Sequence, residues 1–210
     1  MGTLISIEMN GSSEESSRLK MAIGLFDAAN AEDPHTEEAD GKIWPREQLY
    51  AIRLNAWVAR LTEKPSETLL LAAHCQHLRR WCIARDSHPA TKAGYLKWRA
   101  ELKKFHAAES AGILRQCGYD EAIVTAVQSL NLKSNFPADP DSRILEDALC
   151  LVFLQFQMEE LASRTSDEKM INALQKSWRK MSETARQYAL KLRYSPKSQE
   201  LIGKALQGVS

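Results

Sequence analysis

Apolar residues recur at spacings of three and four along most of this chain, which places them on one face of an α-helix. The pattern predicts a first helix over residues 17–30. A second helix is predicted from Pro45 to Thr62, because proline favours the first helical position. A third is predicted from Ser66, a residue type that caps helix N-termini, to about Ile83.

The helical pattern continues through the second half of the chain. A long helix is predicted from Thr91 to Gln116, and Gly118 follows it at a position that favours glycine. The segment 142–162 is apolar around most of its circumference, which is typical of a helix in the centre of a domain. Further helices are predicted over residues 121–130, 167–192 and 196–207.

We find no alternating strand pattern, internal repeat or hairpin signal in the chain. The predicted fold class is therefore all-α, a compact single-domain bundle of about seven or eight helices. Residues 1–16 include a polar run and are expected to be a flexible N-terminal segment. Residues 17–165 are expected to form the core, and residues 166–210 are expected to be C-terminal helices packed on it. Between the first two helices, Pro34 and Gly41 mark an acidic loop, interpreted as a connector in preference to a ligand-contacting lip.

Charge and cysteine usage narrow the class of protein. Lys and Arg number 28 against 27 Asp and Glu, a formal net charge of +1, so no global field requires a nucleic acid or an anionic membrane.

The chain shows no signal peptide and no apolar run long enough to span a membrane, which predicts a cytoplasmic protein. Gly2 and Ser6 match a loose myristoylation pattern, and whether it is used stays open. Four cysteines are interpreted as buried free thiols: Cys75, Cys82, Cys117 and Cys150.

Candidate chemistry concentrates between residues 69 and 106. His74 and His77 lie three apart on a predicted helix, so both could reach one ion. Glu146 and Asp147 lie on the predicted central helix, where a buried carboxylate needs a partner or a metal. Imidazole nitrogen and carboxylate oxygen are the ligands that a divalent metal would use. The alternative is that the histidines are ordinary core groups with hydrogen-bond partners.

From Arg46 to Leu154 the chain resembles the HD-domain superfamily, whose all-helical metal sites use histidines and aspartates on successive helices. The segment LLLAAHCQHL (69–78) resembles the apolar run that leads into the His-Asp pair of that superfamily. His106 resembles an additional histidine of many members, and Asp147 resembles the final aspartate. The resemblance implies an HD-like helical fold with a divalent metal site.

Two positions depart from the HD pattern. Tyr50 stands where the first histidine would fall, three residues before Arg53, and Gln76-His77 stands in place of the His-Asp doublet. Neither a phenol nor an amide replaces an imidazole or a carboxylate as a metal ligand. A single-metal or metal-free derivative of the HD site is therefore the alternative to a two-metal centre.

A second resemblance covers nearly the whole chain. It is similar to a conserved helical domain family of bacteria and fungi with no known function, some fungal members of which are labelled glutamyl-tRNA synthetase-like. We do not apply the synthetase label to this chain, because it has neither the HIGH nor the KMSKS signature of that enzyme class. The similarity rests on DAANAEDP (27–34), LYAIR (49–53), QHLRRW (76–81), GYLKWR (94–99), FHA (105–107), GYD (118–120) and LEDALCLVFL (145–154).

The HD resemblance implies a metal-dependent phosphohydrolase that acts on a nucleotide or another phosphorylated small molecule. Fe, Mn or Zn would be held by His77, His106 and Asp147, with His74 a further candidate, and Glu146 would orient a water molecule. Arginines would bind phosphate and aromatic rings would stack on a base. These ligand-binding candidates are Tyr50, Arg53, Arg79, Arg80, Trp81, Arg85, Tyr95, Trp98 and Arg99, with Arg53 also a catalytic candidate.

Two other functions remain open. An iron-dependent oxygenase of HD type would use the same ligands. A non-catalytic protein would instead bind RNA or a nucleotide through the same arginines and aromatic side chains, without metal. The C-terminal helices from residue 167 onward could also dock a partner or a second copy of the chain.

Overall fold

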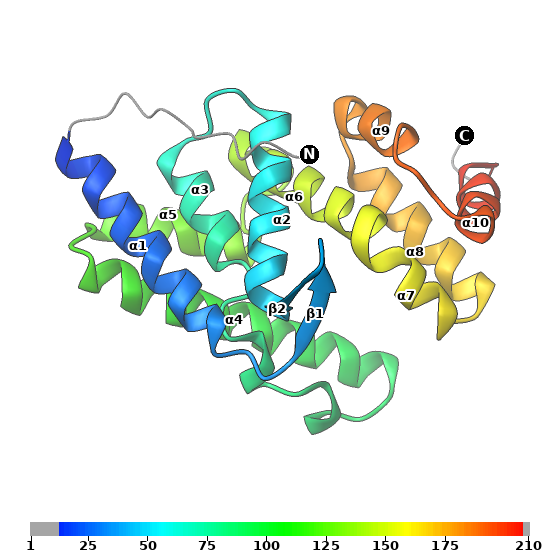
Figure 1. The fold of residues 1–210 in the computed structure, drawn as a ribbon, viewed down its shortest axis with the longest axis horizontal. Helices are drawn as coiled ribbons and strands as arrows, with labels where there is room; N and C mark the ends of the chain where they lie inside the picture. Colours follow the sequence, from blue (N-terminus) through cyan, green and yellow to red (C-terminus); the bar gives the residue numbers. More distant parts are fainter. Residues whose placement is uncertain (1–12, 208–210) are drawn as a thin grey trace.

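The computed structural model describes residues 13–207, and within this range the protein consists of ten α-helices and one two-stranded hairpin (Figure 1). The helices are α1 (Ser13–Ala31), α2 (Arg46–Leu61), α3 (Glu67–Cys75), α4 (Lys92–Gln116), α5 (Glu121–Leu132), α6 (Pro140–Val152), α7 (Met158–Ser163), α8 (Asp167–Lys180), α9 (Glu183–Leu190) and α10 (Pro196–Gln207). The strands are β1 (Thr36–Ala39) and β2 (Lys42–Pro45). Short 3₁₀ turns occupy Arg80–Cys82 and Arg85–Ser87, and a π-helical segment, Phe153–Gln157, joins α6 to α7. The mostly helical fold confirms the predicted class at that level.

Several helix ends lie where their local sequence predicts them. The Ser66 hydroxyl accepts a hydrogen bond from the backbone N–H of Leu69 (3.0 Å) at the start of α3. The Thr91 hydroxyl accepts one from Gly94 N–H (3.1 Å) at the start of α4. Gly118, with φ +77°, follows the last turn of α4 in the left-handed conformation that glycine adopts readily. These ends depend on residues within one helical turn of the boundary.

The acidic loop predicted before α2 is a β-hairpin, and the expectation that no hairpin would be found is wrong. Strands β1 and β2 pair antiparallel, with Thr36 opposite Pro45. The two turn residues, Asp40 and Gly41, have φ of 52° and 72°. Asp-Gly is a strong hairpin signal, because these residues accept positive φ at both turn positions. The strands are only four residues long, TEEA and KIWP, and neither is long enough for a clear alternation of apolar and polar residues.

Helix α3 ends at Cys75, eight residues before its predicted end at Ile83. The chain leaves the helical path at Arg79, which has φ +50° and whose backbone N–H donates to Oδ1 of buried Asn30 (3.1 Å). His74 and His77 therefore do not share a helix face as predicted. A contact with α1, more than forty residues earlier, redirects the chain here.

The predicted helix over 167–192 is two helices, α8 and α9, which meet at Met181 and Ser182. The Ser182 hydroxyl accepts a hydrogen bond from Ala185 N–H (3.2 Å), and its own backbone N–H donates to Oδ1 of Asp147 (2.8 Å). The predicted central helix is divided as well, by the π segment Phe153–Gln157. These two divisions raise the predicted eight helices to ten in the described chain.

One cluster of buried side chains runs from Leu19 in α1 to Ala205 in α10. Helix α2 packs against α3 and α6, α4 packs against α5, and α8 packs against α10, as Figure 1 shows.

Three of the four cysteines are buried free thiols as predicted, whereas Cys82 is exposed. Within residues 13–207, every helix is too short or too polar to cross a lipid bilayer. Residues 1–12, with the Gly2 pattern, lie outside the described part.

Candidate ligand-binding cleft

A cleft of about 950 Å³ lies between α2, α4, α6 with its π segment, and α8. It has an excess of positive charge, since nine basic side chains and four acidic ones line it. The basic residues are Arg46, Arg53, Arg80, Arg85, Arg99, Lys103, Lys133, Arg164 and Lys180. The acidic residues are Glu37, Glu47, Glu146 and Glu160. Because the whole chain has a formal net charge of only +1, this charge is a local property of the cleft.

Glu146 is the centre of a lysine cluster in this cleft. Its side chain is 5% exposed and forms ion pairs with Lys133 and with Lys180, the latter at 3.0 Å. Burial alone would raise the pKa of Glu146, but the two lysines outweigh burial and lower it. Half-buried Lys103 has no carboxylate partner in the described residues, and burial together with Lys133 lowers its pKa. Three lysines therefore line the cleft near Glu146, and only two of them pair with its carboxylate.

Glu47, His77 and Tyr50 form a second polar group, in which Glu47 and Tyr50 are buried and His77 is partly exposed. His77 Nδ1 lies 3.1 Å from Glu47 Oε2, and the His77 ring stacks on the Tyr50 ring with centroids 4.0 Å apart. Burial raises the pKa of Glu47 to about 7, although Arg80, 3.8 Å away, opposes this rise. A carboxyl group with such a pKa can hold or release a proton near neutral pH.

His106 lies beside this group, with its ring centroid 5.9 Å from that of His77. Its Nδ1 is 2.8 Å from the carbonyl oxygen of Leu78. A carbonyl only accepts hydrogen bonds, so Nδ1 carries the proton and Nε2 is the acceptor. Burial lowers the pKa of His106 to about 3 and that of His77 well below its ordinary value. Both imidazoles are therefore neutral at physiological pH.

Aromatic rings and guanidinium groups lie together at the α4 side of the cleft. Trp98 is buried and donates its indole N–H to Ile83 O (3.0 Å). The Arg80 guanidinium lies 4.9 Å from the Trp98 ring centroid, and that of Arg85 lies 5.7 Å from it. Tyr95 is 41% exposed and has the Arg85 and Arg99 guanidinium groups within 6 Å of its ring. Planar cations next to aromatic faces can stack on a flat ligand.

The four predicted metal ligands are not brought together. His77 and His106 line the cleft, whereas Asp147 does not, and its carboxylate accepts the Ser182 N–H. His74 also lies outside the cleft lining, with Nδ1 3.6 Å from Asp27 Oδ1. Between residues 13 and 207, no group of three His, Cys, Asp or Glu side chains is placed to hold a metal ion. The donor set in this structure does not fit an HD-type metal centre.

Most of the predicted ligand-binding residues do line the cleft: Tyr50, Arg53, Arg80, Arg85, Tyr95, Trp98 and Arg99. Glu146, predicted to orient a water molecule, lines it as well. Arg79 and Trp81 do not. Arg79 forms an ion pair with Glu32, the residue after the end of α1 (3.2 Å), and Trp81 lies half-buried in a 3₁₀ turn. Because α3 ends early, these two side chains leave the face that a continuous helix would have given them.

Sequence reasoning missed several residues of the cleft, notably Glu47 and the three lysines around Glu146. The lysines come from α4, the end of α5 and the end of α8, so no local pattern groups them. Glu47 is an acidic residue in the first turn of α2, a common position for a solvated carboxylate, so its sequence position gave no sign that it is buried.

The fold and the cleft together define a mostly helical protein with a basic, partly aromatic cleft. Residues 20–202 match the family model described as "Domain of unknown function (DUF4202)". The match covers most of the chain, so the protein belongs to this family. Neither the curated proteins nor the solved structures contain a significant match to the chain.

Proposed function

We propose that the cleft binds a phosphorylated small molecule, with nucleotides among the candidates. The observation that carries the proposal is the excess of positive charge, above all the three lysines Lys103, Lys133 and Lys180, of which only the last two pair with Glu146. Placing like charges together in a partly buried site is unfavourable unless an anion compensates them. A phosphate group at Lys103, the lysine without a carboxylate partner among residues 13–207, would supply that compensation.

The rest of the cleft suits the remainder of such a ligand. Trp98 and Tyr95 offer aromatic faces, and Arg85 and Arg99 offer planar donors that match phosphate oxygens in pairs. Glu47 and His77 would accept or donate hydrogen bonds at the inner end of the cleft. The volume of about 950 Å³ lies near the upper end of the range for small-molecule sites, roughly 300–1,000 Å³.

We also propose that the helices around the cleft form a divergent version of the HD-domain fold. It is supported by the meeting of His77 and His106 in one cleft, together with Glu146 from the central helix. Because Asp147 is engaged elsewhere, no hydrolytic step through a metal is derived for this chain. Metal-dependent phosphohydrolysis and iron-dependent oxygenation stay hypotheses that metal analysis tests.

RNA binding is a second candidate, and the exposure of Tyr95 is the observation that favours it. The ring is 41% exposed and flanked by Arg85 and Arg99, so an unpaired base could stack there from solvent. In that case the RNA backbone would contact only the edge of the lysine cluster around Glu146.

The proposal is tested by calorimetric titration of the purified protein with pyrophosphate, ADP and a short single-stranded RNA. Lys103→Ala removes the lysine without a carboxylate partner and should weaken pyrophosphate binding by ten-fold or more, since a charge-assisted hydrogen bond contributes about 1.5–3 kcal/mol. The matched control is Lys104→Ala, the exposed neighbour on α4 that lies outside the cleft lining.

Binding of pyrophosphate or ADP that Lys103→Ala weakens and Lys104→Ala leaves intact supports the proposal. No binding of either ligand, or equal losses in the two variants, contradicts it. Tight binding of RNA alone, lost on Tyr95→Ala, favours the second candidate.

A further inference from the structure

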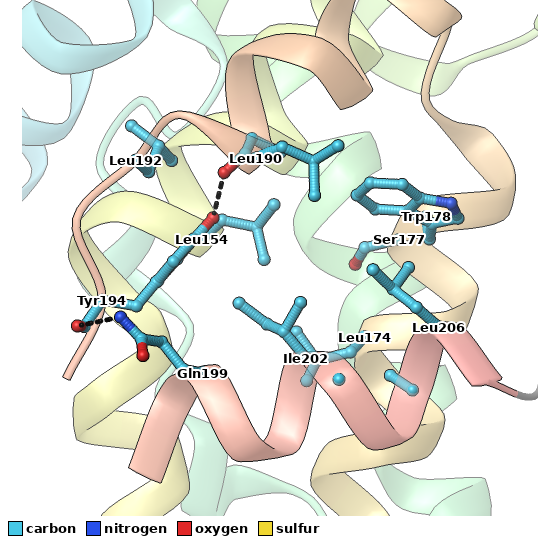
Figure 2. A pocket seen from close by; sticks show the side chains of 13 residues that line it. Leu154, Leu174, Ser177, Trp178, Leu190, Leu192, Tyr194, Gln199, Ile202 and Leu206 are labelled. Carbon is cyan, nitrogen blue, oxygen red and sulfur yellow. Dashed lines mark hydrogen bonds between the residues drawn. The ribbon is translucent and has the colours of Figure 1, made fainter. Parts of the chain in front are cut away.

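A second cavity, of about 310 Å³, lies between α8, α9, α10 and the π segment. Figure 2 shows side chains from these elements converging on it, among them Leu154, Leu174, Trp178 and Ile202. We call this cavity the apolar pocket. Nothing in the phosphate-binding proposal uses it.

Two polar side chains that line the apolar pocket, Tyr194 and Gln199, are hydrogen-bonded within the protein. The Tyr194 hydroxyl donates to Ala189 O (2.9 Å), and the Gln199 side-chain amide donates to Tyr194 O (3.3 Å), as the dashed lines in Figure 2 show. These bonds leave mainly hydrocarbon and the Trp178 indole to contact a bound group. The pocket therefore suits an apolar group without charge.

The pocket is open enough for a ligand to enter. Leu190 lines it and is 61% exposed. Gly203 also lines it, and a Cβ added there would have no heavy atom within 4 Å. Its volume reaches the lower end of the range for small-molecule sites, roughly 300 Å³.

The apolar pocket and the basic cleft are neighbours. Ser177 on α8 lines both cavities. On the π segment, Phe153 lines the cleft and the next residue, Leu154, lines the pocket. One layer of side chains therefore separates a strongly basic cavity from an apolar one.

Lys180 is a charged residue of the cleft that lies close to this boundary. It lies three residues after Ser177 on the same helix, so the two side chains are on one face, about 5–6 Å apart at Cβ. A phosphate bound by the lysine cluster at Lys180 would thus lie about one helical turn from the boundary at Ser177.

We propose that the protein binds one amphipathic ligand, a phosphate ester of an apolar chain, with its phosphate at the lysine cluster and its chain in the apolar pocket. This inference rests on the proposed function, because it uses the same phosphate site. It adds the chemical class of the ligand: an alkyl, acyl or prenyl phosphate. The chain passes the boundary at Ser177, the residue that lines both cavities.

The test is calorimetric titration with methyl, butyl, hexyl and octyl phosphate, each below its micelle concentration, and with octanol as the uncharged probe. In the unmodified protein, affinity should rise about three- to fourfold per methylene as the chain becomes buried. Methyl phosphate and pyrophosphate report on the phosphate site alone.

Two variants change the apolar pocket without touching the cleft. Leu190→Glu places a charge at its mouth, and Gly203→Trp adds bulk where open space is available. The matched control is Met21→Glu, which alters an equally apolar, 56% exposed side chain on α1, outside both cavities. Circular dichroism and unfolding curves establish that each variant is folded.

The inference predicts that Leu190→Glu and Gly203→Trp abolish the rise with chain length, that Met21→Glu keeps it, and that all three bind methyl phosphate normally. Equal affinity for methyl and octyl phosphate overturns the inference and leaves the proposed function standing. Octanol binding as tightly as octyl phosphate also overturns it, since the pocket then acts alone. Failure of both pyrophosphate and every alkyl phosphate to bind overturns the two proposals together.

Discussion

His77 and His106 illustrate how burial sets the chemistry of single residues in the cleft. Both rings are neutral because the charged form would lose its hydration inside the protein. Glu47 responds to the same burial in the opposite direction, and its pKa rises to about 7. At neutral pH the two imidazoles are uncharged and Glu47 is about half ionised, while the arginine side chains of the cleft remain charged. Glu47 and the two histidines therefore offset only a small part of the positive charge of the cleft.

Replacing His106 by Gln should flatten the pH dependence of stability on the acid side. The pKa of His106 is lowered from 6.5 to about 3, so the folded state binds fewer protons than the unfolded state in that window. Stability is therefore lost as pH falls from 6.5 toward 3, by about 1.4 kcal/mol per pH unit for one group. Gln keeps an N–H donor for Leu78 O but does not titrate.

Urea unfolding of the parent protein and of His106→Gln at pH 7, 6 and 5 measures this effect. The free energy of unfolding of the parent should fall more steeply than that of the variant. The contribution of Glu47, which has the opposite sign between 4.5 and about 7, is present in both proteins and cancels in the comparison. Parallel curves would mean that His106 titrates normally in the folded protein.

At the scale of elements, Asp147 links the central helix to the C-terminal helices. Its carboxylate accepts the backbone N–H of Ser182 at the start of α9, where the positive end of the helix favours an anion. The resemblance to HD domains assigned this aspartate to a metal. In the structure it instead holds the end of a helix that packs against α6.

Asp147→Ala should lower the free energy of unfolding by about 1–2 kcal/mol, the usual effect of losing a helix-capping partner. Asp147→Asn keeps an acceptor oxygen and should lose less. Neither variant should change pyrophosphate affinity, because Asp147 does not line the cleft. Chemical denaturation and calorimetry measure the two effects, and a loss of ligand binding with unchanged stability would point to a direct role in the site.

At the scale of the whole molecule, charge is distributed unevenly. The chain is nearly neutral, with a formal net charge of +1, yet nine of its cationic side chains and only four of its acidic ones line one cleft. Such a concentration attracts anions over distances comparable with the Debye length, about 10 Å at 0.1 M salt. Ligand binding in the cleft should therefore depend on ionic strength.

Pyrophosphate affinity should fall several-fold when NaCl is raised from about 0.05 to about 0.5 M, because salt screens the cluster. The gain in affinity from butyl to octyl phosphate should not weaken, since apolar burial does not depend on charge. Titrations at three salt concentrations separate the two contributions. A pyrophosphate affinity that is independent of salt would contradict a charge-based site.

Metal content distinguishes the HD-type hypotheses from the binding proposal. Protein purified without a His-tag, incubated with Fe²⁺, Mn²⁺ or Zn²⁺ and desalted, should retain much less than one equivalent, because the donor set is dispersed. Elemental analysis of the parent, His77→Ala and Asp147→Ala measures it. Near one equivalent in the parent, absent from both variants, would establish the shared metal site instead.

The sequence alone determined which segments form helices and where many of them begin and end. Ser66, Thr91 and Gly118 were identified correctly because each boundary depends on bonds within a few residues. It also identified most of the arginine and aromatic residues of the cleft, because these cluster between residues 76 and 99. Local periodicity and local capping contain this information directly.

Tertiary structure alone decided where helices break and which charges meet. Arg79 leaves the helical path because its N–H bonds to Asn30, and Asp147 turns to Ser182, 35 residues later. The pairing of Glu146 with Lys180 joins residues 34 apart. Burial and long-range hydrogen bonds control these features, and neither is expressed in the spacing of residues along the chain. For that reason the basic cleft, unlike the helices around it, became visible only once the chain was folded.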